Sequence, residues 1–168
     1  MQKIGEANKD RNISDVCRPD GNNRRKRHIP GCKRVHPINC EASSQLNEEH
    51  DCWKAFDGFC NRNNGWASKG EGVGAWIKAT LSSEKLVSNL KLRQRNMPGE
   101  GNKKVEIEVS PTENHLDTLR LKGDRSWNNI KLSRNVLTKY VKITIKEVYG
   151  QVNNGFKEIE IYECDNNN

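Results

Sequence analysis

Oxygen-bearing side chains are concentrated in one short stretch, WKAFDGFCNRNNGWAS, which runs from residue 53 to residue 68. Between its two outer tryptophans it carries one carboxylate and three amides: Asp57, Asn61, Asn63 and Asn64. Calcium binds about six to eight oxygens from carboxylates, amides and backbone carbonyls, and Gly58 and Gly65 let carbonyls turn inward. The stretch therefore predicts either a calcium site or, without metal, an Asx-turn loop in which Asp57 accepts hydrogen bonds from nearby amides.

Residues that could carry out catalysis are few. The chain has four histidines, at positions 28, 36, 50 and 115, and it contains no GxSxG, HExxH or glycine-rich phosphate-binding motif. Its acidic residues fall mostly at exposed positions of alternating segments, where ion pairs between neighbouring strands explain them. We therefore expect a binding module and not an enzyme.

The cysteines indicate the compartment. Six are present: Cys17, Cys32, Cys40, Cys52, Cys60 and Cys164. They lack the paired CxxC spacing of zinc sites. We interpret them as disulfides, and the protein as secreted. Six cysteines allow about fifteen pairings, so the spacing alone leaves the connectivity open.

The basic character of the chain belongs to its first 39 residues. They carry ten Lys and Arg against four Asp and Glu, whereas residues 40–168 carry nineteen against eighteen. This N-terminal extension has no apolar period, so we expect it to be irregular and flexible. Its basic run is Arg24, Arg25, Lys26 and Arg27. Three interpretations of the run stay open: a solvated segment, a processing site like those cut by furin-like proteases, or a docking patch for acidic glycans.

The body of the chain is nearly neutral, which argues against nucleic-acid binding, because that function favours basic residues spread over a folded face. Apolar residues make up only 33% of the chain, and none of its segments approaches the length of apolar sequence that spans a membrane.

Alternating apolar and polar residues predict strands throughout this body. Val105, Ile107 and Val109 alternate with Glu106 and Glu108, and similar patterns occur at residues 141–145 and 158–161. Further candidate strands cover residues 75–81, 87–93, 117–121 and 129–132. Turn signals separate them, for example at Ser82-Ser83 and Gly123-Asp124. With no amphipathic helix of ten residues or more, the pattern predicts an antiparallel sandwich or barrel.

The order of several motifs resembles a known family. In sequence they are AFDG (55–58), GWAS (65–68), AWIKATL (75–81), VSNLKLRQR (87–95), KKVEIEVS (103–110), KYVKITIKEVYG (139–150) and GFKEIEIYE (155–163). Together they resemble the discoidin, or coagulation-factor type C, domain of the galactose-binding-like superfamily. The resemblance covers about residues 40–164.

The resemblance implies an all-β fold, an antiparallel eight-stranded jelly-roll sandwich at 40–164, preceded by the extension 1–39 and followed by a short tail at 165–168. Family members often join their two ends by a disulfide, which here would be Cys40–Cys164. Cys52–Cys60 would then flank the Asp57 loop, and Cys17–Cys32 would remain for the extension.

The resemblance also completes the calcium site. In its calcium-binding branch a second carboxylate comes from the last strand, at the position that Glu158 occupies. The ligand set we predict is Ala55, Asp57, Asn64 and Glu158, with calcium in a structural role. Trp66 is assigned to the core, where it anchors the far end of the loop.

Binding loops of this family cluster at one end of the sandwich, and here they correspond to residues 45–51 and 93–102. They offer His50, Glu49, Arg93 and Arg95 as candidate ligand-binding residues, because two guanidinium forks can donate to sugar hydroxyls or to an acidic substituent. The alternative is that both arginines pair internally with Glu100 or Glu106.

The predicted function is therefore lectin-like recognition of glycans or glycoproteins by a secreted, non-catalytic module in adhesion or the extracellular matrix. Two alternatives use the same loops: binding to a phospholipid surface and binding to a protein receptor. The phospholipid interpretation ranks second, because Leu46 and Met97 offer little apolar surface and the nearby Glu48, Glu49 and Glu100 repel anionic headgroups.

Overall fold

The computed structural model describes residues 29–60, 64–95, 97, 99–110, 115–124, 126–150 and 152–165. The chain forms the strands β1 (Cys32–Val35), β2 (Asn39–Ala42), β3 (Trp66–Ala67), β4 (Trp76–Gln94), β5 (Asn102–Ser110), β6 (His115–Arg120), β7 (Trp127–Val148) and β8 (Gly155–Cys164). Two short 3-10 helices, η2 (Glu48–His50) and η3 (Cys52–Ala55), lie between β2 and β3. No helix in these ranges is long and apolar enough to cross a membrane.

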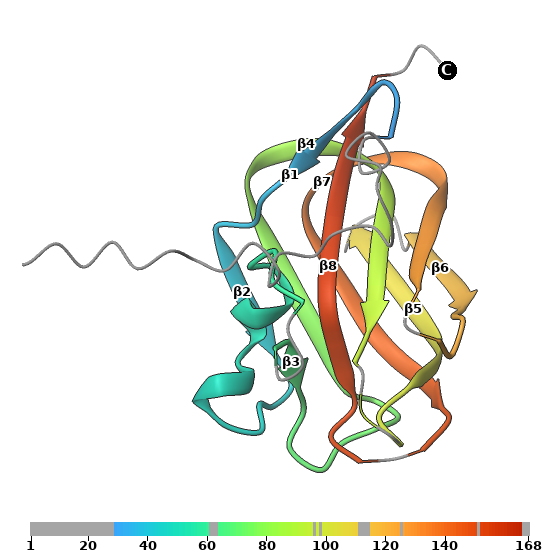
Figure 1. The fold of residues 1–168 in the computed structure, drawn as a ribbon. Helices are drawn as coiled ribbons and strands as arrows, with labels where there is room; N and C mark the ends of the chain where they lie inside the picture. The colour runs from blue at the N-terminus through green and yellow to red at the C-terminus, as the bar shows by residue number, and fades with distance from the viewer. Residues whose placement is uncertain are drawn as a thin grey trace, which may run out of the picture.

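All pairings between these strands are antiparallel, and two long strands, β4 and β7, bend from one layer of the sandwich into the other (Figure 1). The first half of β4 pairs with β2 and the second half of β7, which continues to β5 and β6. The second half of β4 pairs with β8 and the first half of β7. The predicted turn at Ser82-Ser83 is thus wrong as a strand end: β4 continues through it, with a register irregularity between Thr80 and Lys85.

The core lies between the two layers and is built by the predicted alternation. Fully buried side chains from both layers belong to one apolar cluster, among them Ile77, Ile107, Ile143, Leu90, Leu92, Ile159 and Ile161. Trp66 is fully buried, its indole nitrogen donates to the carbonyl of Ser44 at 2.9 Å, and its ring stacks on Phe156. The predicted eight-stranded β fold and the core position of Trp66 are therefore confirmed.

The N-terminal boundary of the fold lies earlier than predicted. β1 falls inside the segment 1–39 that the sequence analysis treated as a flexible extension, yet it pairs with β8 along its whole length. Val35 joins the core cluster, and Figure 1 shows β1 beside the end of β8. The pattern missed this strand because its four residues include the two cations Lys33 and Arg34, and so show no apolar alternation.

The disulfide pairing differs from the expectation as well. The bonds are Cys32–Cys164 and Cys40–Cys52, so the expected bonds Cys40–Cys164, Cys52–Cys60 and Cys17–Cys32 are all wrong. Cys32 stands opposite Cys164 in the β1–β8 register, so the added strand, and not β2, provides the partner at the end of the last strand. Cys60 is also disulfide-bonded. Cys17 and the basic run at 24–27 lie outside the described residues.

Candidate functional site

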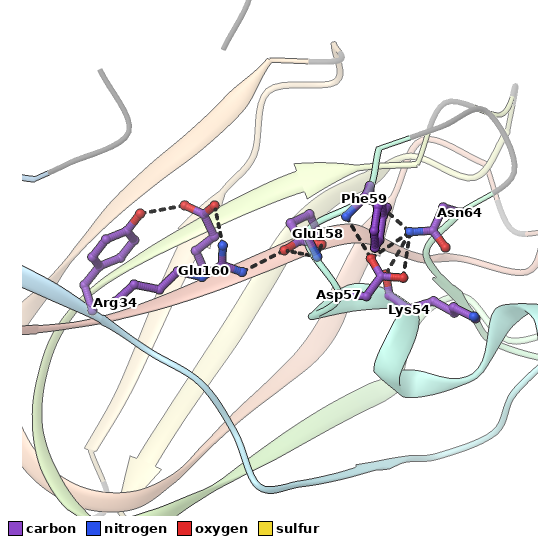
Figure 2. A network of polar contacts seen from close by, with 9 residues as sticks. Arg34, Lys54, Asp57, Phe59, Asn64, Glu158 and Glu160 are labelled. Atoms are coloured by element: carbon purple, nitrogen blue, oxygen red, sulfur yellow. Dashed lines mark hydrogen bonds and ion pairs between the residues drawn. The ribbon is translucent and has the colours of Figure 1, made fainter. Parts of the chain in front are cut away.

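The loop after η3 gathers oxygens around one amide group. The Asp57 carboxylate accepts a hydrogen bond from the Phe59 amide at 2.9 Å, which is the expected Asx turn. The Asn64 side-chain nitrogen lies 2.8 and 3.1 Å from the two Asp57 oxygens, 2.9 Å from the Phe59 carbonyl and 3.5 Å from the Lys54 carbonyl (Figure 2). Four oxygens of three residues thus converge on a single donor.

Two glycines make this geometry possible, as the sequence predicted. Gly58 and Gly65 both have positive φ, of 78° and 119°. A Cβ on Gly65 would lie 2.7 Å from the Phe156 carbonyl oxygen and from the Lys157 Cα, so the far end of the loop packs directly against the backbone of β8.

Glu158 lies on β8 beneath this loop and is fully buried. The Gly58 amide donates to both of its oxygens, at 3.1 and 3.2 Å, and the Arg34 guanidinium lies 2.8 Å from one of them. Burial raises the pKa of Glu158 to about 8; the charge of Arg34 acts against this shift, and the nearby charge of Asp57 adds to it. Burial also raises the pKa of Asp57, so the two carboxylates form a partly desolvated acidic pair.

Arg34 is a cation that the sequence analysis did not anticipate at this position. Its guanidinium spans two carboxylates of β8, Glu158 at 2.8 Å and Glu160 at 3.2 Å, and the Tyr162 hydroxyl donates to the second oxygen of Glu160 (Figure 2). A short polar strand within a basic segment gave no signal for this role.

The donor set around Asp57 fits calcium. The converging oxygens belong to a carboxylate and to backbone carbonyls, the hard ligands that calcium prefers, and Glu158 adds a second negative charge close by. The carbonyls that face the cluster are those of Lys54 and Phe59, whereas the sequence analysis named Ala55, which is buried in η3. Within the described ranges no three His, Cys, Asp or Glu side chains gather at one point, so carbonyl and amide oxygens would have to complete the shell.

The candidate ligand-binding residues divide into two groups. Arg95 is buried, its Nε lies 2.6 Å from Glu100, and its Nη1 donates to the Gly65 carbonyl at 3.3 Å. The internal pairing that the sequence analysis kept as an alternative is therefore what the structure has for Arg95. Its charge lies close enough to lower the pKa of His50, after the larger effect of burial.

His50 and Glu49 belong to η2 at the same end of the sandwich, and the charges of Glu49 and Glu100 act on His50 in the opposite direction. The His50 Nδ1 lies 2.8 Å from the Asn47 side-chain oxygen, which holds the ring. The charges of Arg95 and Glu100, from the loop after β4, thus act on His50 in η2.

Arg93 lies apart from this group. Its guanidinium is 5.9 Å from the centre of the Trp127 ring, and its Nε is buried without a hydrogen-bond partner. Trp127 is the residue opposite Arg93 in the β4–β7 register. The sequence analysis missed Trp127, although its position between a turn and the predicted strand at 129–132 was a usable signal.

Comparison with known proteins identifies the family. Residues 39–161 match the model of the F5/8 type C domain. The chain belongs to this family. No curated protein matches it.

Several solved structures share the fold of this F5/8 type C domain. A chitosan-binding module of a chitosanase/glucanase from Paenibacillus sp. IK-5 is 25% identical with a TM-score of 0.61, over 76% of this chain and 96% of that one. The family 32 CBM of C. perfringens NanJ, in complex with galactose, is 17% identical with a TM-score of 0.65, over 79% and 99%. An F5/8 type C domain from Bacteroides fragilis is 16% identical with a TM-score of 0.67, over 82% and 99%.

Proposed function

We propose that this F5/8 type C domain is a secreted, non-catalytic module that recognises carbohydrate with the loops at the end of the sandwich that carries η2. One observation carries the proposal: His50 and Glu49 lie together on η2, within reach of the charges of the buried Arg95–Glu100 pair in the neighbouring loop. Sugar hydroxyls both donate and accept hydrogen bonds, and a site with its polar groups already in place loses little entropy on binding.

The side chains of this region suit such a ligand. The Arg95–Glu100 pair is buried and rigid, so it holds the loop and leaves His50 and Glu49 to meet the sugar. The indole of Trp53, in the adjacent η3, is exposed and offers an apolar face to a sugar ring. Similar modules include a chitosan-binding module and modules in complex with galactose and with an unsaturated mannuronic acid, which supports glycans or glycoproteins as the partners.

We expect calcium to occupy the cluster of Asp57, Asn64 and the neighbouring carbonyls, with Glu158 beside it. Bound there, the ion would supply charge compensation and hold the loop between η3 and β3 against β8. Its role would be structural. The disulfide-bonded cysteines support secretion, because such bonds persist in oxidising compartments, and hence a role in adhesion or the extracellular matrix.

The ligand is tested with the full chain on a glycan array, followed by calorimetric titration of the best glycan. His50→Ala should lower affinity about tenfold, the value of one well-placed hydrogen bond, and leave the melting temperature unchanged. The matched control is His36→Ala, which removes an imidazole next to β1, outside these loops. Equal affinity in both variants would place the glycan elsewhere on the molecule.

One observation favours phospholipid binding as a second candidate. Four apolar side chains, Val73, Met97, Tyr149 and Val152, are exposed in loops that connect the two layers, which is more apolar surface than Leu46 and Met97 alone suggested. Co-sedimentation with vesicles that contain phosphatidylserine tests it. Binding that is lost in Met97→Ser/Val152→Ser but kept in His50→Ala would rank this function first.

A further inference from the structure

The cysteines leave one pairing open for the N-terminal extension. The bonds from β1 to β8 and from β2 to η3 take up four of the six cysteines. Cys60, in the loop after η3, is disulfide-bonded as well, and among the described residues no cysteine is free. The one cysteine of the chain that remains is Cys17. Because a disulfide joins two cysteines, elimination makes Cys17 the partner of Cys60.

A tight turn directs the chain before β1 back along β8. The Cys32 amide donates to the Ile29 carbonyl at 2.9 Å, with Pro30 and Gly31 between them and a φ of 73° at Gly31, the pattern of a type II turn. The Asp165 amide donates to the Gly31 carbonyl at 3.1 Å, which fixes the turn to the end of β8 (Figure 1). Because such a turn reverses the chain, the residues before Ile29 approach it from the opposite end of β8.

Cys60 lies near that opposite end. The amide of Gly58, two residues before Cys60, donates to the Glu158 carboxylate at 3.1 Å. From Glu158 to the end of β8 an antiparallel strand rises by about 20 Å. The residues between the two attachment points, 18–28, can extend to about 40 Å. They are therefore long enough to follow β8 and to cover a neighbouring strand as well.

One row of side chains on the outer face of this layer shows where a cover lies. Glu160 on β8, Lys91 on β4 and Asn129 on β7 stand side by side in register. Glu160 and Lys91 are only 3% and 8% exposed, whereas Asn129 is exposed, as is Lys131 further along β7. The outer face of an antiparallel layer ordinarily meets water. A further segment therefore covers β8 and β4 and stops before β7.

None of the described strands lies over this row. The described elements with extensive contacts to β8 are β1, β3 and β4, which pair with it edge to edge, and η3, whose following loop contacts Glu158 near one end. Tyr162, on the same outer face, is 3% exposed. Tyr162 and Lys91 both have interactions in addition to their mutual contact and the Tyr162–Glu160 hydrogen bond. The extension has the length and the attachment points to supply this cover.

Charge also favours the extension at its turn end. Glu163 and Asp165 line a hollow of about 460 Å³ beside the turn, together with Lys33. The basic run ends at Arg27, two residues before Ile29. The run thus begins its course along β8 next to two carboxylates, and opposite charges at a partly enclosed surface attract each other.

We propose that residues 18–28 form a strap over the outer face of β8 and β4, fixed by a Cys17–Cys60 disulfide at one end and by the turn before β1 at the other. The surface that the strap occupies is centred on Lys91, Glu160 and Tyr162. The anchor lies three residues after Asp57, so the disulfide also restrains the oxygen-rich loop. The basic run lies within the strap, so cleavage there leaves the two pieces covalently joined.

Peptide mapping of the full chain without reduction tests the anchor. Digestion with pepsin at low pH, where disulfides do not exchange, should yield two peptides joined through Cys17 and Cys60. Trypsin cuts within residues 24–27 of the native protein should leave the two pieces joined until a reductant is added. A bond from Cys60 to any other cysteine, or to a second copy of the chain, would overturn the proposal.

Acetylation of lysines, followed by mass spectrometry, tests the docking. In the wild type Lys91 should react at least tenfold more slowly than Lys131, which is exposed on the same face. In Cys17→Ser/Cys60→Ser the strap has one attachment only, so Lys91 should react at least threefold faster than in the wild type, with Lys131 unchanged. The matched control is Cys40→Ser/Cys52→Ser, which removes a disulfide away from the strap and should keep Lys91 protected.

Equal reaction rates of Lys91 and Lys131 in the wild type would overturn the strap, because the face would then be open. Protection of Lys91 that is unchanged in Cys17→Ser/Cys60→Ser would also overturn it, because the sheet itself would then be the cover. Melting curves of each variant separate release of the strap from unfolding. If that double variant does not fold, the peptide map and the two rates in the wild type decide the proposal.

Discussion

Two neighbouring regions of one sheet layer differ in whether their charged side chains have partners within the protein. Beneath the loop after η3, the carboxylates of Glu158 and Glu160 are buried and share the guanidinium of Arg34. One strand further, Arg93 on β4 stands opposite Trp127 on β7. The carboxylates of the first region are compensated by Arg34, whereas the Nε of Arg93 is buried without a hydrogen-bond partner.

The contrast is sharpest between Arg93, near the end of β4, and Arg95, the first residue after that strand. Arg95 is buried in an ion pair with Glu100, whereas the Arg93 guanidinium lies 5.9 Å from the centre of the Trp127 ring and its Nε has no hydrogen-bond partner. The same residue type therefore forms a buried ion pair at one position and keeps a buried donor without a partner two residues earlier. What differs is which loop supplies a counter-charge.

The largest loss of stability is expected when the ion pairs between Arg34 and the two glutamates are removed. Arg34→Met removes the cation between Glu158 and Glu160, and breaking a buried ion pair of this kind should cost about 3 kcal/mol of unfolding free energy. Denaturant titration of the variant measures it. Lys33→Met, at an exposed position of the same strand, is the control and should change stability by less than about 0.5 kcal/mol. Equal stability of the two variants would contradict a structural role for Arg34.

Arg93 and Arg95 give the next test. Arg95→Ala leaves Glu100 buried without its partner, so it should destabilise the fold by about 2–3 kcal/mol and lower the melting temperature. An arginine that only binds a ligand would behave differently, because its removal would leave the melting temperature unchanged. Arg93→Ala should cost about 1 kcal/mol, since only the cation–π contact with Trp127 is lost. The opposite order would show that Arg93, and not Arg95, makes the stabilising interaction.

Calcium should raise the free energy of unfolding by about 2–3 kcal/mol when its concentration is about a hundred times the dissociation constant, because the unfolded chain lacks the site. Differential scanning fluorimetry in calcium and in EDTA measures the shift. Asp57→Ala should abolish it, whereas Asp124→Ala, which removes an exposed carboxylate that accepts from Ser126, should keep it. A wild type insensitive to calcium would leave the Asx turn alone at this loop.

The smallest effect is the pH dependence of stability without calcium. The pKa of Glu158 is about 8 in the folded state against 4.5 for its ordinary value, so between these values the folded state holds the extra proton. The resulting stabilisation is complete below about pH 4.5 and is lost as the pH rises through 8, with a slope of at most about 1.4 kcal/mol per pH unit. In EDTA, Glu158→Gln should flatten this fall between pH 6 and 8; an unchanged slope would assign it to another group.

Much of the fold could be predicted because its signals are local. The alternation at 105–109, 141–145 and 158–161 marks strands that bury every second side chain, and these segments lie in β5, β7 and β8. Trp66 was placed in the core, and the Asp57 turn was read from an Asp-Gly pair. Each of these features depends on residues that are close in the sequence.

The charge partners and the disulfides could not be predicted, because each joins residues far apart in the chain. Arg34 reaches Glu158 across 124 positions, and Cys32 reaches Cys164 across 132. Both contacts follow from the pairing of β1 with β8, and a strand of four mostly polar residues has no periodic signal of its own.

The sequence by itself determined the strand positions, the family resemblance and the oxygen-rich loop, since side-chain period and turn chemistry act over a few residues. Only the tertiary structure decided that Arg95 is paired and Arg93 is not, and that Trp127 stands opposite Arg93. The physical reason is that burial and charge compensation depend on which strands and loops are in contact. These contacts are set by the strand register, and the period of the sequence does not determine that register.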